Sequence, residues 1–255
     1  MRHCETAMSQ VEAIWVLKQI AASACGLLAM TILFVSSVFA FEVKGTISVN
    51  PPYPAAAIFT VDEKHAESCG PEQASPALMV SSDGGVRNAV VWLDPHPNPN
   101  TDPSPIGGEG RVRGDIPTLH QKNCRFDPHV LIVPAGQEFQ ITNEDPMVHD
   151  VRIFDDALML ERFEMNEKGK PVTRRFDKPG RYLVRCGFHK WMHAYIINAG
   201  HDYYAVTDAG GGFRLDNVPS GAYTLHVWHE RLGEASQMLD LTGDERNLTH
   251  VFEAR

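Results

Sequence analysis

A cysteine, two histidines and a methionine lie within eight residues of the segment "RCGFHKWMHAY", which spans residues 185–195. Thiolate, imidazole and thioether groups all bind soft metal ions. Cys186, His189 and Met192 recur every third residue, and they follow the strand-like run "RYLVRC". A surface turn rich in polarisable side chains has the same composition, so the spacing alone leaves both interpretations open.

A metal site of this kind needs one more strong ligand, because copper in electron-transfer proteins is held by one thiolate, two imidazoles and a weak axial Met. His149 meets this requirement, since it begins another β-rich run in "TNEDPMVHDVRIF" after a turn that contains proline. Zinc prefers four strong ligands, often with paired cysteines, so the set favours copper. His193 directly follows Met192 and is an alternative axial ligand.

The elements that must position these ligands are short β-rich runs separated by Gly, Pro, Asn and Asp, a pattern typical of sandwiches and barrels. The sequence therefore predicts an all-β protein. Residues 95–110, part of "DPHPNPNTDPSPIGGEG", are too rich in Pro, Asn and Gly for a helix or a strand, and they predict a linker. Residues 155–170 predict an irregular excursion between two strands, with one helical turn as the alternative.

The segments around these ligands resemble the cupredoxins, a family of blue-copper proteins. "HVLIVPAGQEFQITNEDPMVHDV" is similar to the family's stretch with the upstream histidine, and "FDKPGRYLVRCGFHKWM" to the stretch with the other ligands, in a loop most like that of amicyanin. The resemblance implies a Greek-key β-sandwich over residues 111–200 that holds one mononuclear, type 1-like copper ion. His149, Cys186 and His189 would be the equatorial ligands and Met192 the axial one.

The same resemblance implies electron transfer, with the ring edge of His189 facing solvent in an apolar patch where a protein redox partner docks. We expect Asn143, in the turn before His149, to steady the two ligand loops through backbone hydrogen bonds. For His129 we expect a structural hydrogen bond near Cys124 more than a second metal. The remaining histidines lack ligand-like spacing, and surface or capping positions are expected for them: His65, His96, His120, His201, His226, His229 and His250.

A second resemblance covers both ends of the chain. "TDAGGGF" and "PSGAYTL" are similar to the turn and strand of the transthyretin-like sandwich that forms the regulatory domain of carboxypeptidases, and "VKGTISV" and "VRNAVVWL" are similar to its first half. This implies a discontinuous small β-sandwich made of residues 41–94 and 201–255. As a whole, the chain resembles exported proteins labelled methylamine-utilisation or plastocyanin-like.

Residues 1–40 have the pattern of a signal peptide, in which Lys18 precedes an uncharged run over residues 20–39 and Ala40 suits signal peptidase. An uncleaved membrane anchor is the alternative, since about 20 apolar residues can span a bilayer. Without this segment three of the five cysteines remain. In an oxidising compartment such as the periplasm, Cys69 and Cys124 are expected to pair and leave Cys186 free.

The net charge of −9 argues against nucleic acid as a partner, because phosphate binding needs a basic face. A Met-capped site leaves no open position for a substrate, and no paired acid and base or nucleophile stands beside it, so no enzymatic activity is expected. The predicted function is single-electron transfer between redox partners. Copper delivery or storage and a metal-free interaction module are the alternatives.

Overall fold

The computed structural model describes residues 40–96, 116–242 and 246–253. Residues 1–39 of the expected leader and 97–110 of the expected linker lie outside these ranges. Almost every described element is a strand, and the one helix among them is α2 (Glu63–Cys69). The predicted all-β class is confirmed. Within this part of the chain, no helix has the length and hydrophobicity that spanning a bilayer requires.

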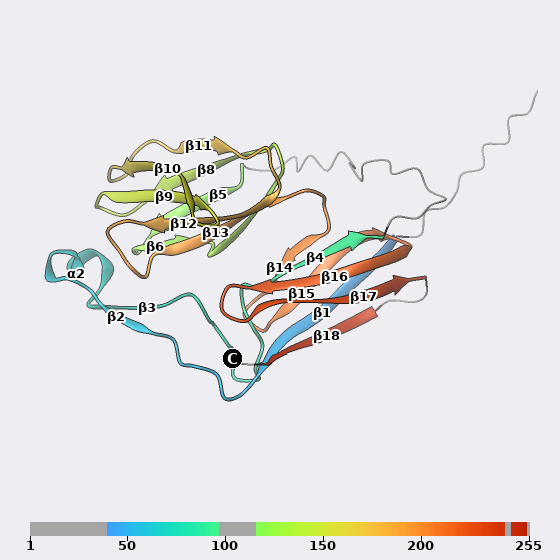
Figure 1. Cartoon of the computed structure of the whole chain (residues 1–255). Helices are drawn as coiled ribbons and strands as arrows, with labels where there is room; N and C mark the ends of the chain where they lie inside the picture. Colours follow the sequence, from blue (N-terminus) through green and yellow to red (C-terminus); the bar gives the residue numbers. More distant parts are fainter. Residues whose placement is uncertain (1–39, 97–115, 243–245, 254–255) are drawn as a thin grey trace, which may run out of the picture. The chain divides into compact units, whose positions relative to one another are not determined.

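Two sheets between residues 118 and 199 form the first sandwich (Figure 1). One has the strand order β10 (Leu158–Met165), β9 (His149–Asp155), β12 (Gly180–Cys186), β13 (His193–Ala199) and β7 (Val130–Pro134). The other has the order β11 (Val172–Arg175), β8 (Glu138–Asn143), β5 (Thr118–Lys122) and β6 (Arg125–Asp127). The apolar faces of both sheets bury one core, which includes Phe139, Ile141, Ile153, Val184 and Ile196.

Strand alternation brings Cys186 into this core. Successive side chains of a strand point to opposite faces, and on β12 the residues Tyr182, Val184 and Cys186 are the buried ones. Cys186, the last residue of β12, pairs with Val151 of β9, so His149, the first residue of β9, lies at the same end of the sheet. The loop after Cys186 returns at once, because Arg185 already pairs with His193 of β13. The register therefore gathers both ligand segments at one end of the sandwich.

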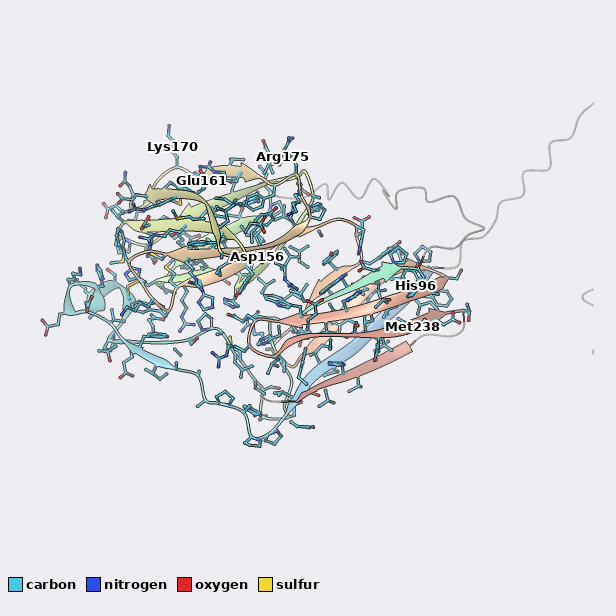
Figure 2. All side chains as sticks on the ribbon, viewed as in Figure 1. His96, Asp156, Glu161, Lys170, Arg175 and Met238 are labelled. Atoms are coloured by element: carbon cyan, nitrogen blue, oxygen red, sulfur yellow. A yellow bond between two sulfur atoms is a disulfide. The ribbon has the colours of Figure 1, made fainter. Side chains whose placement is uncertain are left out.

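Strands from both ends of the described chain form the second sandwich (Figure 1). One sheet has the order β15 (Gly212–Pro219), β1 (Ala40–Asn50) and β18 (Arg246–Glu253). The other has the order β14 (Tyr204–Val206), β4 (Val90–Pro95), β16 (Gly221–His229) and β17 (Gly233–Leu241). Side chains fill the space between these sheets, whereas Met238 on the outer face of β17 is 77% exposed (Figure 2).

Two local features differ from the sequence-based expectation. Residues 158–165 are not irregular, because β10 forms a ladder with β9 from Leu158 to Met165 that satisfies its backbone groups despite its helix-favouring Leu, Met and Glu residues. The second feature is the segment of residues 58–74, here called the cover segment. It contains β2 (Ile58–Thr60), α2 and β3 (Glu72–Ala74). Its Phe59, Val61 and Cys69 pack into the core of the first sandwich.

Candidate metal centre

Three ligand-type side chains converge at the end of the first sandwich. The Sγ atom of Cys186 lies 3.6 Å from Nδ1 of His149 and 3.6 Å from Nδ1 of His189. The three donor atoms all lie within 4.8 Å of one another, and all three residues are buried. Met192 is 1% exposed and lines the same cavity as Cys186 and His189. The structure thus brings together the four predicted ligand residues.

The spacing of these donors fits a metal ion. A first-row ion binds an imidazole nitrogen at about 2.0 Å and a thiolate sulfur at about 2.3 Å, so the two atoms lie about 3.7 Å apart in a trigonal plane. Both observed distances from nitrogen to sulfur are 3.6 Å. The distances from the Cys186 sulfur to His149 and to His189 therefore both fit a shared ion.

Asp145 fixes the orientation and tautomer of His149. Nε2–H of His149 donates a 2.9 Å hydrogen bond to Oδ2 of Asp145, and a neutral imidazole carries its proton on only one nitrogen. In the neutral ring Nδ1 then presents its lone pair to Cys186, whereas in the protonated ring Nδ1–H donates to the Cys186 thiolate. Among metal-binding proteins such a carboxylate partner commonly sets the ring orientation of a histidine ligand. Sequence reasoning missed Asp145, although its position four residues before His149 in "NEDPMVHD" was the available signal.

Burial and hydrogen bonding shift the protonation of the pair formed by His149 and Cys186. Burial alone lowers the pKa of His149, but hydrogen bonds to Asp145 and Cys186 outweigh it and raise the pKa to about 9. Burial alone raises the pKa of Cys186, whereas hydrogen bonds from His149 and His189 lower it to about 6. At neutral pH the metal-free site therefore holds a thiolate, the form of cysteine that binds metals.

His189 does not face solvent. It is 2% exposed, so the expectation of an exposed ring edge is wrong. The ring of His65, on α2, meets His189 edge-on with centroids 4.9 Å apart, and the centroid of the Trp191 ring lies 5.0 Å from that of His189. Phe59 of the cover segment packs on Trp191 in turn. The cover segment causes the burial of His189. Its contact with the ligand loop could not be predicted from the spacing of residues in the sequence.

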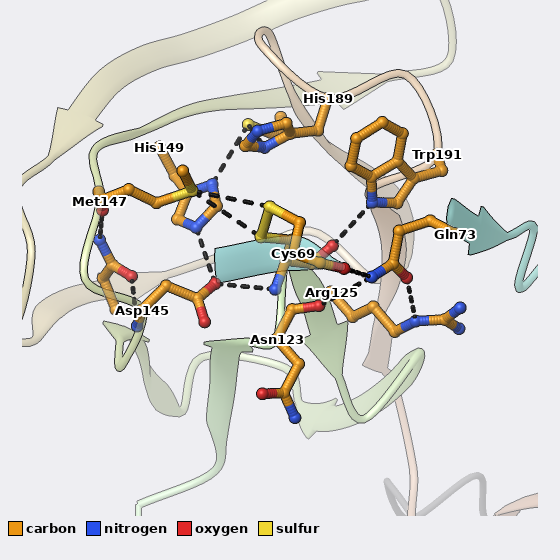
Figure 3. Close-up of a disulfide and its surroundings, with 12 residues drawn as sticks. Cys69, Gln73, Asn123, Arg125, Asp145, Met147, His149, His189 and Trp191 are labelled. Atoms are coloured by element: carbon orange, nitrogen blue, oxygen red, sulfur yellow. Dashed lines mark hydrogen bonds and ion pairs between the residues drawn. A yellow bond between two sulfur atoms is a disulfide. The ribbon is translucent and has the colours of Figure 1, made fainter. Parts of the chain in front are cut away.

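The predicted disulfide between Cys69 and Cys124 is present and ties the cover segment to the first sandwich (Figure 3). The backbone of Cys124 also forms hydrogen bonds with both ligand loops. Its N–H donates to Oδ2 of Asp145 at 2.9 Å, and its carbonyl accepts a 2.9 Å hydrogen bond from Nε1–H of Trp191. Cys124 therefore contacts three separate segments that surround the candidate site.

Asn143 holds only the upstream ligand loop. Its Oδ1 accepts a hydrogen bond from the N–H of Asp145, and its Nδ2 donates to the carbonyl of Met147 and to the carbonyls of residues 165 and 166. The expected brace to both loops is thus observed for the loop before His149. The link between the two loops is a different one, in which the N–H of Gly187 donates to the carbonyl of Asp150 at 2.7 Å.

His193, the alternative axial ligand, has both ring nitrogens engaged elsewhere. Nδ1 lies 3.2 Å from the carbonyl oxygen of Trp191, and Nε2 lies 2.9 Å from Oε2 of Glu230. His129 makes the structural hydrogen bonds that were expected, but its partners are Glu230 and the carbonyl oxygen of His193 and not Cys124.

Comparisons with known proteins agree with the fold of this part of the chain. The family model for the cupredoxin-like domain matches residues 115–197. Among solved structures, a novel purple cupredoxin from Nitrosopumilus maritimus is 20% identical, with a TM-score of 0.29 and coverage of 33% of this chain and 100% of its own. An amicyanin variant in the Cu(I) state is 16% identical, with a TM-score of 0.30 and coverage of 35% and 87%.

A copper-containing nitrite reductase from Thermus scotoductus SA-01 is 25% identical, with a TM-score of 0.30. The match covers 34% of this chain and only 23% of the reductase, so the chain spans about a quarter of that protein. No curated protein matches the chain. The family match thus supports a cupredoxin-like domain within the described residues 116–197.

Proposed function

We propose that this chain is an exported protein that binds a single copper ion at its cupredoxin-like domain and transfers single electrons between redox partners. The observation that carries the proposal is the convergence of Cys186 Sγ with Nδ1 of His149 and Nδ1 of His189, each 3.6 Å away. One thiolate with two imidazoles is the donor set that copper uses in electron-transfer sites. Bound copper would supply one-electron chemistry between its Cu(I) and Cu(II) states.

Met192 is the proposed fourth ligand. It is buried and lines the same cavity as Cys186 and His189, whereas the ring nitrogens of His193 contact Trp191 and Glu230. A thioether at a long distance completes a trigonal site without opening a position for substrate. For this reason we propose an electron carrier instead of an enzyme.

The protein part of the mechanism is to keep the donor atoms in place. Asp145 fixes the ring of His149, the N–H of Cys186 donates to the carbonyl of Met192 at 2.9 Å, and the indole of Trp191 anchors the ligand loop to Cys124. Buried groups held by several hydrogen bonds change position little when the charge of the site changes. Small rearrangement favours fast electron transfer.

Compartment and partner follow from other features. A disulfide between Cys69 and Cys124 suits an oxidising compartment, which supports export to the periplasm. A protein redox partner would dock near His189, and the cover segment with His65 would form part of that surface. The second sandwich, which we propose is transthyretin-like, would present a further protein-binding surface.

The test is a visible and electron paramagnetic resonance spectrum of the copper-loaded protein. We expect an intense thiolate-to-copper band that Cys186→Ser abolishes. Met192→Leu should change the hyperfine pattern and the reduction potential, while Met238→Leu, on the outer face of β17, should leave both unchanged. Absence of the intense band from the copper-loaded wild-type protein would refute the proposal.

One observation favours a second candidate function, copper delivery or storage. The cover segment buries His189, and the Nε2 atom of His189 has no hydrogen-bond partner among the described residues. Electrons would enter and leave the site through His189, so burial of this ring slows electron exchange with a partner. The electron self-exchange rate of the copper protein decides between the two: fast exchange supports the carrier, and slow exchange with transfer of Cu(I) to a chelator supports delivery.

A further inference from the structure

A second group of ligand-type side chains lies apart from the three donors described above. His129 precedes β7, His193 begins β13, and Glu230 follows β16. Their side chains are 8%, 17% and 10% exposed, respectively. Nε2 of His129 lies 2.5 Å from Oε1 of Glu230, and Nε2 of His193 lies 2.9 Å from Oε2 of the same carboxylate. All three donor atoms lie within 4.8 Å of one another.

The hydrogen bonds on the far sides of both rings decide where their protons lie. Nδ1 of His129 is 3.1 Å from the carbonyl oxygen of His193, and Nδ1 of His193 is 3.2 Å from the carbonyl oxygen of Trp191. A carbonyl oxygen only accepts hydrogen bonds, so each Nδ1 carries a proton and donates it. In the neutral imidazoles both Nε2 atoms then present lone pairs to Glu230.

An ionised carboxylate also only accepts hydrogen bonds. The lone pairs of His129, His193 and Glu230 therefore converge in a largely buried space and repel one another unless a cation lies between them. The separations of 2.5 and 2.9 Å between nitrogen and oxygen suit a proton on each ring, and a metal ion requires the carboxylate to move away from the rings so that each donor lies about 2.0 Å from the ion. Two imidazole nitrogens and one carboxylate form a donor set that binds zinc and other first-row divalent ions. Histidine ligands of metals commonly donate their other ring N–H to a backbone carbonyl, as both rings do here.

We propose that His129, His193 and Glu230 bind one divalent first-row metal ion, of the zinc type, at a site separate from that of Cys186. Access for the ion and for a water as fourth ligand exists, because His129 and His193 border one cavity, and His193 and Glu230 border the cavity that Cys186, His189 and Met192 also line. Met192 and His193 are neighbours in the chain, so the two centres would be joined by one peptide unit.

A titration of the full chain with Co²⁺ alone tests the site. Cobalt bound at Cys186 gives thiolate charge-transfer absorption in the near ultraviolet, whereas cobalt bound to two histidines and one glutamate gives only visible ligand-field bands. We expect wild-type protein to bind two equivalents with both signatures. Cys186→Ala should keep one equivalent and only the ligand-field bands, and Zn²⁺ should displace this cobalt. This result does not depend on copper or on electron transfer.

Two variants and a control identify the ligands. In the Cys186→Ala background, Glu230→Gln and His129→Gln should each weaken Co²⁺ binding beyond the roughly 10–100-fold that loss of a ligand-orienting group causes. Glu234, on β17, is an exposed residue that pairs with Arg181 of β12. The control variant Glu234→Gln should leave the affinity for Co²⁺ unchanged. Circular dichroism establishes that each variant is folded. If Cys186→Ala binds no cobalt, or if Glu230→Gln and His129→Gln bind it as before, the proposal is overturned and the cluster holds protons only.

Discussion

The indole Nε1–H of Trp191 donates a 2.9 Å hydrogen bond to the carbonyl oxygen of Cys124 (Figure 3). This contact joins the loop that carries His189 to the residue that forms the disulfide with Cys69. Because the N–H of Cys124 also holds Asp145, stability of the fold and geometry of the candidate site depend on the same few bonds.

Loss of the disulfide should destabilise the fold. The bond joins residues separated by 55 positions in sequence. By the chain-entropy relation a loop of this length contributes about 4 kcal/mol. We expect the double variant Cys69→Ala/Cys124→Ala to lose a similar amount of unfolding free energy in urea. Reductant should lower the stability of wild-type protein but not of the variant, and equal sensitivity of both proteins to reductant would contradict the prediction.

Asp145→Asn should weaken copper binding by about 10–100-fold, the usual effect of removing a group that orients a histidine ligand. An amide oxygen can still accept one hydrogen bond, but it lacks the charge that holds Nε2–H of His149. Competition with a chelator of known affinity measures the change. Glu144→Gln is the matched control, because Glu144 is exposed and pairs with His120 and Lys122 instead. Equal affinity of the Asn variant and this control would refute the orienting role of Asp145.

His65→Ala should expose the ring of His189 and raise the electron self-exchange rate several-fold. The imidazole of His65 lies edge-on against His189, and an alanine leaves that side open to solvent or to a partner. Nuclear magnetic resonance line broadening of mixed redox states measures the rate. His96→Ala, which removes an exposed ring bonded to Thr224, should change nothing. An unchanged rate in His65→Ala would mean that electrons reach the site by another face.

Gly187→Ala should disturb the ligand loop. A Cβ atom at residue 187 would lie 2.1 Å from Oδ2 of Asp150 and 2.4 Å from Nη2 of Arg152. Because the side chain of Asp150 is buried, we expect a loss of about 1–3 kcal/mol of stability from overpacking, together with a change in the copper spectrum. Gly180→Ala, at the start of β12, places a Cβ atom that meets nothing closer than 3.7 Å and is the control. Identical melting temperatures for the two variants would contradict the clash.

Stability should fall in mild acid because of His229. Burial lowers the pKa of His229 from 6.5 to about 4, and the nearby Glu230 only partly offsets this. Between these pH values the unfolded chain binds a proton that the folded protein does not. The contribution is thus complete above pH 6.5 and is lost as the pH falls to 4, by up to about 3 kcal/mol.

Urea unfolding of wild-type protein and of His229→Gln between pH 4 and pH 7 measures this contribution. The Gln variant should have a flatter dependence of unfolding free energy on pH. Met238→Leu, which alters an exposed side chain that does not titrate, should keep the wild-type slope. Parallel slopes for His229→Gln and wild type would exclude His229 as the group that titrates.

Short-range patterns were enough to predict the β class and the residues that meet at the candidate site. Strand alternation ending at Cys186, a turn before His149 and the three-residue spacing to His189 and Met192 are local signals, and the pairing of β9 with β12 turns them into one constellation. The disulfide followed from the cysteine count, because three cysteines remain beyond residue 40 and Cys186 stands among the candidate ligands, which leaves Cys69 and Cys124 to pair.

Tertiary structure alone decided what surrounds these residues. The burial of His189 depends on His65, which is 124 positions away in the chain, and the rings of His129 and His193 meet Glu230, in a strand connection of the second sandwich. Such contacts arise from the packing of segments with no shared periodicity, so no local pattern of residue types records them. The sequence by itself determined which atoms could bind a metal, and the fold determined which of them are oriented, covered and paired to do so.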